Sequence, residues 1–80
     1  MTYNFTKIIQ SGPFEIRIDP AARYGYFEHD TKGDLCGGGL WFEQLDGGVL
    51  ALVDYDGVFE LPREVKEGLQ GLGYIVTEEF

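Results

Sequence analysis

Hydrophobic and polar residues alternate most regularly in residues 14–19, FEIRID. The three apolar side chains share one side of an extended chain, which predicts a strand with one apolar and one polar face. Residues 3–10 and 23–29 also mix aromatic and β-branched residues with polar ones, and we expect strands there. A Gly-Pro turn separates the first two strands, which are close enough in sequence to form a hairpin.

The longest apolar run, residues 49–53, lies between two turns rich in aspartate and glycine. Such a run predicts a strand that is buried on both faces, with the rest of the chain packed around it. Residues 40–45 predict a further strand, joined to this one by a tight turn at Asp46-Gly47-Gly48. Residues 30–39 are first polar and then glycine-rich, so we expect them to form the longest loop.

Helical spacing replaces the strand pattern near the C-terminus, and residues 62–72 predict one amphipathic helix. Its apolar stripe consists of Val65, Leu69 and Leu72. Pro62 suits the first helical position, where no partner for an amide proton is needed, and Gly73 suits the C-terminal cap. Gly68 and Gly71 each weaken the helix by up to about 1 kcal/mol relative to alanine, so we expect packing to stabilise it.

Together these elements predict an α+β fold with an antiparallel sheet of four to six strands and the helix across one face. Residues 74–77 would form the last strand. We expect a single domain over residues 1–80, which buries roughly 60% or slightly more of its unfolded surface. One short helix cannot cover a whole sheet, so the other face would curl on itself, stay partly polar or pack against a second copy.

Charge changes this picture more than overall composition does. Fourteen acidic residues against six basic ones give a formal net charge of −8 and an isoelectric point near 4.3. A surface of this sign repels nucleic acids and anionic membranes, so we expect no direct contact with either. The charge favours a partner protein with a basic surface, or it serves solubility alone.

The sequence contains neither the apolar core of a signal peptide nor the roughly 20 apolar residues of a membrane span. The single cysteine, Cys36, excludes an internal disulfide framework and suits a reducing compartment. We therefore expect a cytoplasmic location. One cysteine and one histidine are too few for a structural zinc site, and we expect no metal and no cofactor.

Two acidic pairs are spaced so that an extended chain places both members on one face, about 6.5 Å apart. They are Glu28 with Asp30, and Asp54 with Asp56. Such pairs either contact basic side chains of a partner or form solvated Asx turns. Asp54-Tyr55-Asp56-Gly57 also resembles part of a calcium loop, but the further acidic ligands and the closing glutamate are missing.

Signals for an enzyme are weak. Gly37-Gly38-Gly39 lacks the lysine and the spacing of a phosphate-binding loop, and it fits a flexible turn or a place where backbone lies close to Trp41. Cys36 and His29 could act as nucleophile and base, but no third residue is recognisable that would orient them. A chain of this size rarely provides a concave site with several converging titratable groups, so an enzyme is the third hypothesis.

Aromatic residues are more informative, because six Phe, five Tyr and one Trp are many for a core with one helix. Tyr24, Tyr26, Trp41 and Tyr55 have charged or glycine neighbours. Rings surrounded by acids are typical of a protein-binding face, in which the rings anchor the partner and the charges steer it. The alternative is that these rings complete the core and keep their polar tips in water.

Several segments, YGYFEHD, GGGLWFE, LVDYDGVFELP and LGY, together resemble a family of short uncharacterised proteins encoded by bacteria and phages. The resemblance covers roughly residues 19–76 and implies no activity for any residue. In size and acidity the chain is also similar to anti-CRISPR proteins and other phage-encoded inhibitors. Several of these inhibitors occupy the nucleic-acid-binding surface of their target.

We therefore predict a non-enzymatic binding protein, an inhibitor of the anti-CRISPR type from a phage or mobile element, that docks on a basic surface of its target. The predicted partner-binding residues are Tyr26, Glu28, Asp30, Asp34, Trp41, Asp54, Tyr55 and Asp56. The alternative is a homodimeric structural or assembly module that covers its free sheet face with aromatic side chains.

Overall fold

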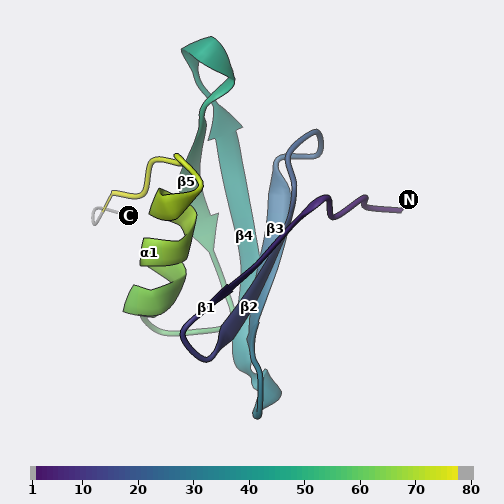
Figure 1. The fold of residues 1–80 in the computed structure, drawn as a ribbon, viewed down its shortest axis with the longest axis vertical. Coiled ribbons are helices and arrows are strands. Elements are labelled where there is room, and N and C mark those ends of the chain that lie inside the picture. The colour runs from purple at the N-terminus through teal and green to yellow at the C-terminus, as the bar shows by residue number, and fades with distance from the viewer. Residues whose placement is uncertain (1, 78–80) are drawn as a thin grey trace.

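The computed structural model describes residues 2–77, apart from the side chain of Asp34. Five strands form one antiparallel sheet in the order β1-β2-β3-β4-β5, and one helix packs against it (Figure 1). The elements are β1 (Lys7–Ser11), β2 (Phe14–Asp19), β3 (Tyr24–His29), β4 (Gly33–Gln44), β5 (Leu50–Tyr55) and α1 (Arg63–Gly71). This confirms the predicted α+β fold with a single helix near the C-terminus.

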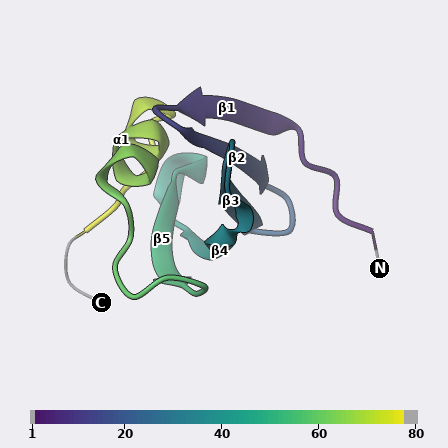
Figure 2. The ribbon, with the colours of Figure 1, turned by 90° about the horizontal axis from the view of Figure 1, so that it is seen from below.

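The alternation in β2 decides which face of the sheet forms the core. Phe14, Ile16 and Ile18 are buried, whereas Glu15 and Arg17 are only partly covered on the opposite face. Successive strands follow as antiparallel neighbours, so the same division continues across the sheet. Figure 2 shows that the sheet is strongly curved and that α1 lies on its concave side, next to both edge strands β1 and β5.

Helix α1 contacts the sheet closely because Gly68 has no side chain. Val65 and Leu69 of its apolar stripe are fully buried. A Cβ atom at Gly68 would lie 2.9 Å from Ile16 Cδ1 and 2.9 Å from Ser11 Cβ, closer than packed carbon atoms approach. The hydroxyl of Ser11 also donates a hydrogen bond of 2.6 Å to a main-chain carbonyl in the first turn of α1. The glycine that weakens the isolated helix therefore permits its packing.

Both ends of α1 are close to the predicted ones. Pro62 was predicted as the first helical residue. In the structure it is the N-cap and the helix begins at Arg63, because the ψ of Pro62, 141°, is not helical. Gly73 has a φ of +86° and ends the helix as predicted. The amide of Gly73 donates to the carbonyl of Gln70 (2.9 Å), and the amide of Tyr74 donates to the carbonyl of Leu69 (3.2 Å), which is a Schellman motif.

The prediction that residues 49–53 form a central, doubly buried strand is wrong. They belong largely to β5, the last strand of the sheet, and Val53 is 47% exposed. The register shifts opposite β4, because Trp41 pairs with Asp54 and Phe42 pairs with Leu52, so Val53 is an extra residue. Since α1 covers only one face, the apolar run has an uncovered side.

The prediction that residues 30–39 form the longest loop is also wrong, because β4 begins at Gly33 and includes all three consecutive glycines. Neighbouring backbone lies so close to Gly37 and Gly38 that side chains have no room there. A Cβ atom at Gly37 would overlap the carbonyl oxygen of Phe27, and one at Gly38 would overlap the carbonyl oxygen of Asp56. Glycine here allows close packing of the strands, which composition alone does not distinguish from flexibility.

Residues 74–77, predicted as a last strand, make only a single parallel bridge between Ile75 and Ala51. The amide of Ile75 donates to the carbonyl of Leu50, and the amide of Leu52 donates to the carbonyl of Ile75, both at 2.9 Å. This short contact satisfies part of the outer edge of β5.

Candidate functional site: the open face of the sheet

The face of the sheet turned away from α1 is called the open face. In β3, Tyr26 and Glu28 alternate with the buried Phe27, and in β4, Trp41 follows the buried Leu40. Alternate residues of a strand share a face, so Tyr26, Glu28 and Trp41 lie on the open face. The structure thus brings three predicted partner-binding residues together.

Five aromatic rings pack in a row on the open face. We call them the aromatic cluster, which consists of Trp41, Tyr24, Tyr3, Phe5 and Tyr26. Neighbouring ring centroids in this order are 5.4, 4.7, 5.7 and 5.1 Å apart, within the usual range for aromatic pairs. Trp41 and Tyr3 remain 38% and 44% exposed. The buried core contains none of these five rings, which argues against the alternative that Tyr24, Tyr26 and Trp41 complete it, whereas Tyr55 does pack against the core.

Sequence reasoning missed two members of the aromatic cluster, Tyr3 and Phe5. They precede β1, and the chain leaves β1 on the side away from α1 (Figure 2). The amide of Asn4 donates a hydrogen bond of 2.8 Å to Oδ2 of Asp19, which attaches this segment to the end of β2. The available signal was the spacing of Tyr3 and Phe5, which places both rings on one side of an extended chain.

Two carboxylates of the predicted set lie at the β5 end of the open face. Asp54 and Asp56 flank Tyr55, whose ring packs against the core side, so both carboxylates lie on the other side. The amide of Gly39 donates to Oδ1 of Asp56 (2.7 Å), and the amide of Asp56 donates to the carbonyl of Gly39 (3.1 Å). Asp56 is therefore held beside β4, whereas Oδ1 of Asp54 accepts a hydrogen bond from the adjacent main-chain amide of Tyr55.

The structure does not bring the other predicted residues to the open face. Tyr55 pairs with the buried Leu40 and is half-buried against the core. Asp30 lies in the turn after β3, where its Oδ1 is 3.5 Å from Nδ1 of His29. The side chain of Asp34 lies outside the described part of the chain. The partner-binding residues on the open face are thus Tyr26, Glu28, Trp41, Asp54 and Asp56.

A hollow of about 220 Å³ lies between β3 and β4 on the open face. We call it the glycine trough; Tyr24, Tyr26 and Glu28 line it together with Gly37–Gly39 of β4. In the strand register, Gly37 lies opposite Glu28 and Gly39 lies opposite Tyr26. The indole of Trp41 lies close to Gly39, because a Cβ atom at Gly39 would lie 2.8 Å from its Cη2. This is the close approach to Trp41 that the sequence suggested as one role for the glycines.

Electrostatic interactions on the open face are dominated by acidic groups. Burial raises the pKa of the Tyr24 phenol, and the neighbouring Tyr3, Asp56 and Tyr26 raise it further. Arg17 lies in β2, next to β3. Its guanidinium donates a hydrogen bond to Glu15, and this bond raises the pKa of Arg17. This base is thus paired with an acid.

The remaining acids of the open face have no such partner. Within residues 2–77, Glu28, Asp54 and Asp56 form no ion pair with a basic side chain at 4 Å or less. The open face therefore presents acidic groups that are available to a partner.

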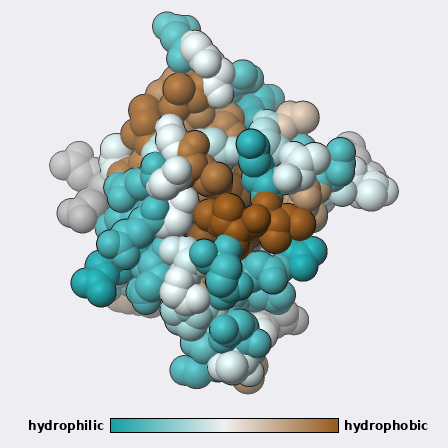
Figure 3. All heavy atoms as spheres, in the orientation of Figure 1, coloured by the Kyte–Doolittle hydropathy of each residue, from teal (hydrophilic) through white to brown (hydrophobic). Residues whose placement is uncertain are grey.

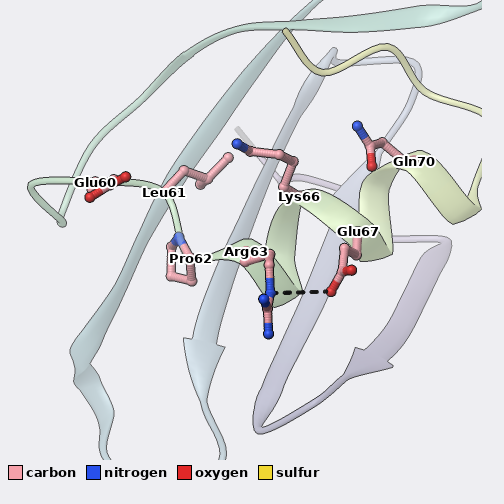
Figure 4. Close-up of a pocket in the computed structure, with 7 residues that line it drawn as sticks. All are labelled: Glu60, Leu61, Pro62, Arg63, Lys66, Glu67 and Gln70. Carbon is pink, nitrogen blue, oxygen red and sulfur yellow. Dashed lines mark ion pairs between the residues drawn. The ribbon is translucent and has the colours of Figure 1, made fainter. Parts of the chain in front are cut away.

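A larger hollow, of about 550 Å³, lies beside the first turns of α1 (Figure 4). Its charged lining consists of Glu60 and Glu67 with Arg63 and Lys66, so acids and bases balance. Nε of Arg63 lies 3.9 Å from Oε1 of Glu67, an exposed i,i+4 pair that contributes about 0.3–0.5 kcal/mol at most. None of the described residues that line this hollow is aromatic. Size alone therefore does not make it a better candidate than the glycine trough.

The groups considered for catalysis or metal binding are engaged elsewhere. Nδ1 of His29 lies 3.1 Å from the hydroxyl of Thr31, and Cys36 packs against the core. Among the side chains that the structure describes, no group of three His, Cys, Asp or Glu could hold a metal ion. In the same part of the chain, no helix has the length and apolar character needed to cross a membrane.

Comparisons with known proteins add nothing to this description: no family model matches the chain, and neither a curated protein nor a solved structure shows significant similarity. The resemblance to short bacterial and phage-encoded proteins stays a prediction.

Proposed function

We propose that this protein is a non-enzymatic binding module whose open face docks on a basic surface of a partner protein. One observation carries the proposal: the aromatic cluster and the carboxylates of Glu28, Asp54 and Asp56 share one exposed sheet face. Large, partly rigid rings provide contact area at the centre of an interface, and charges around them select a partner of opposite sign.

The net charge of −8 acts in the same direction. Exposed charges interact over about 8–10 Å at physiological salt, so a partner rich in Lys and Arg would be attracted before contact. Surfaces of that kind are typical of proteins that bind nucleic acids. A module docked there would compete with the nucleic acid, which is the mode of action of an inhibitor of the anti-CRISPR type from a phage or mobile element.

Binding to a basic probe tests the proposal. Trp41 is the only tryptophan and lies on the open face, so its fluorescence reports binding of a poly-arginine or poly-lysine peptide there. We expect saturable binding that weakens steeply between low and high salt. Salt-independent binding, or no binding at low salt, would overturn the proposal.

A pair of charge variants locates the binding surface. Asp54→Asn removes one charge from the open face, and Glu67→Gln removes one from α1, on the opposite side. Two charges 4 Å apart in water interact by about 1 kcal/mol, so Asp54→Asn should weaken binding by about fivefold, and Glu67→Gln should change it much less. Equal effects of the two variants would show that net charge, and not the open face, governs binding.

One observation favours the alternative of a homodimeric assembly module. β1 is an edge strand, Ile8 on it is 54% exposed, and Figure 3 shows apolar surface over its first part. An exposed edge strand with an apolar side chain is a site where a second copy can pair. Light scattering distinguishes the two functions: a dimer that Ile8→Lys dissociates supports assembly, and a monomer excludes it.

A further inference from the structure

We infer that the glycine trough receives a single arginine side chain of the basic partner, with its guanidinium between the ring of Tyr26 and the carboxylate of Glu28. This inference rests on the proposed function and adds the contact on which docking would depend.

The size of the glycine trough favours a side chain over a free small molecule. Pockets for small ligands usually have about 300–1,000 Å³, whereas the trough has about 220 Å³. Its floor is backbone, because Gly37 and Gly39 have no side chains to fill it. A Cβ atom at Gly39 would lie 2.8 Å from Cη2 of Trp41 and 3.2 Å from Oδ1 of Asp56, so a larger residue would displace these neighbours. The hollow therefore depends on glycine at these positions of β4.

The walls of the trough favour a cation. Tyr24 and Tyr26 contribute aromatic rings, and Glu28 contributes a carboxylate. A cation near the face of an aromatic ring is attracted by the electrons of the ring, and the attraction increases when water is displaced. Asp56, held by the amide of Gly39, adds a second negative charge at the β5 side. An anionic ligand would be repelled by both carboxylates.

Arginine fits these walls better than lysine. A guanidinium is planar and weakly hydrated, so it stacks on rings and donates to a carboxylate at the same time, whereas an ammonium group holds its water tightly. The chain itself places a guanidinium next to this site: Arg17 lies opposite Tyr26 in the strand register, and Tyr26 and Glu28 both favour its charged form. Because Arg17 pairs with Glu15, Glu28 remains available.

Nuclear magnetic resonance with a single amino-acid probe tests this inference. The ¹⁵N-labelled protein is titrated with N-acetyl-arginine amide, with the lysine analogue and with the neutral citrulline analogue. We expect the arginine probe to shift the amide signals of Gly37, Gly38 and Gly39 in a saturable way and to bind at least threefold more tightly than the lysine probe. The citrulline probe should cause no such shifts.

Matched variants connect the shifts to the trough. Glu28→Gln should weaken binding of the arginine probe by about fivefold, the effect of one nearby charge in water. Glu43 lies on the same face of the sheet, two residues after Trp41 in β4 and outside the trough. Glu43→Gln removes the same charge there and should change binding less than twofold. Tyr26→Leu, which keeps an apolar side chain but removes the ring, should also weaken binding. If Tyr26→Leu does not fold, Glu28→Gln and its control still decide the question.

Each negative result has a definite meaning. Shifts spread over the acidic surface, equal effects of Glu28→Gln and Glu43→Gln, or equal binding of lysine and arginine would overturn the arginine pocket. None of these results would affect salt-dependent binding of a basic polymer to the open face. Conversely, if the arginine probe binds in the trough but basic polymers do not bind, the docking function fails and the pocket stands.

Discussion

Two glycines of α1 should respond in opposite ways to the same substitution. Gly71→Ala should stabilise the protein, because the added methyl group would meet no described residue within 4 Å beyond its own helix backbone and chain neighbours, and alanine favours the helix. The expected gain is about 0.4–1 kcal/mol, which corresponds to roughly 2–8 °C in the melting temperature of a domain of this size.

Gly68→Ala gains the same helix propensity but should destabilise the protein. Its methyl group would lie 2.9 Å from Ile16 Cδ1, and Ile16 is fully buried. Overpacking of this kind costs about 1–3 kcal/mol. Moving α1 away would also weaken the hydrogen bond from Ser11 to the helix, at about 0.5–1.5 kcal/mol. After subtraction of about 1 kcal/mol for propensity, the expected net loss is about 0.5–3.5 kcal/mol.

Thermal and urea unfolding of both variants, followed by far-ultraviolet circular dichroism, measures these changes. The two substitutions are chemically identical and three residues apart in one helix, so each is the control for the other. If Gly68→Ala raises the melting temperature as much as Gly71→Ala does, α1 does not pack against β1 and β2 as closely as the 2.9 Å distances at Gly68 require.

Two further predictions concern stability. Main-chain hydrogen bonds, chiefly from Asn4, lower the pKa of the Asp19 carboxyl below its ordinary value of 3.8. The ionised carboxylate therefore contributes its full stabilisation above about pH 3.8, and this stabilisation is lost as the pH falls through the lowered pKa of the folded protein. Asp19→Asn should therefore reduce the difference in stability between pH 5 and pH 2, measured by urea unfolding, and an unchanged difference would contradict this. Gly38→Ala should prevent folding or lower the melting temperature by more than about 10 °C, because its methyl group would overlap the Asp56 carbonyl. A loss of unfolding free energy below about 0.5 kcal/mol, the level of an ordinary surface substitution, would contradict the close packing of β4 on the segment after β5.

The local elements of the fold could be predicted because their causes are local. The alternation in β2, the apolar stripe of α1 and the glycine that ends the helix each depend on side chains a few residues apart. The same local rules failed for residues 30–39 and 49–53. Glycine has no side chain whose pattern could predict a strand, and an apolar run does not show how many of its faces will be covered.

The candidate site was only partly visible in the sequence, for the same reason. Tyr26, Glu28, Trp41, Asp54 and Asp56 were predicted from their own neighbours, and the structure places all five on the open face. The structure adds Tyr24 as their neighbour in the cluster, together with two rings from the segment before β1. That segment crosses the sheet because of contacts fifteen or more positions away.

From the sequence alone follow the charge, the strand and helix periods, and the fold class, because each depends on residue type and short spacing. Tertiary structure decided which face α1 covers, which rings meet, and where three glycines leave a hollow between phenol rings and carboxylates. Those outcomes depend on the register and curvature of the whole sheet, to which every strand contributes and which no short segment specifies.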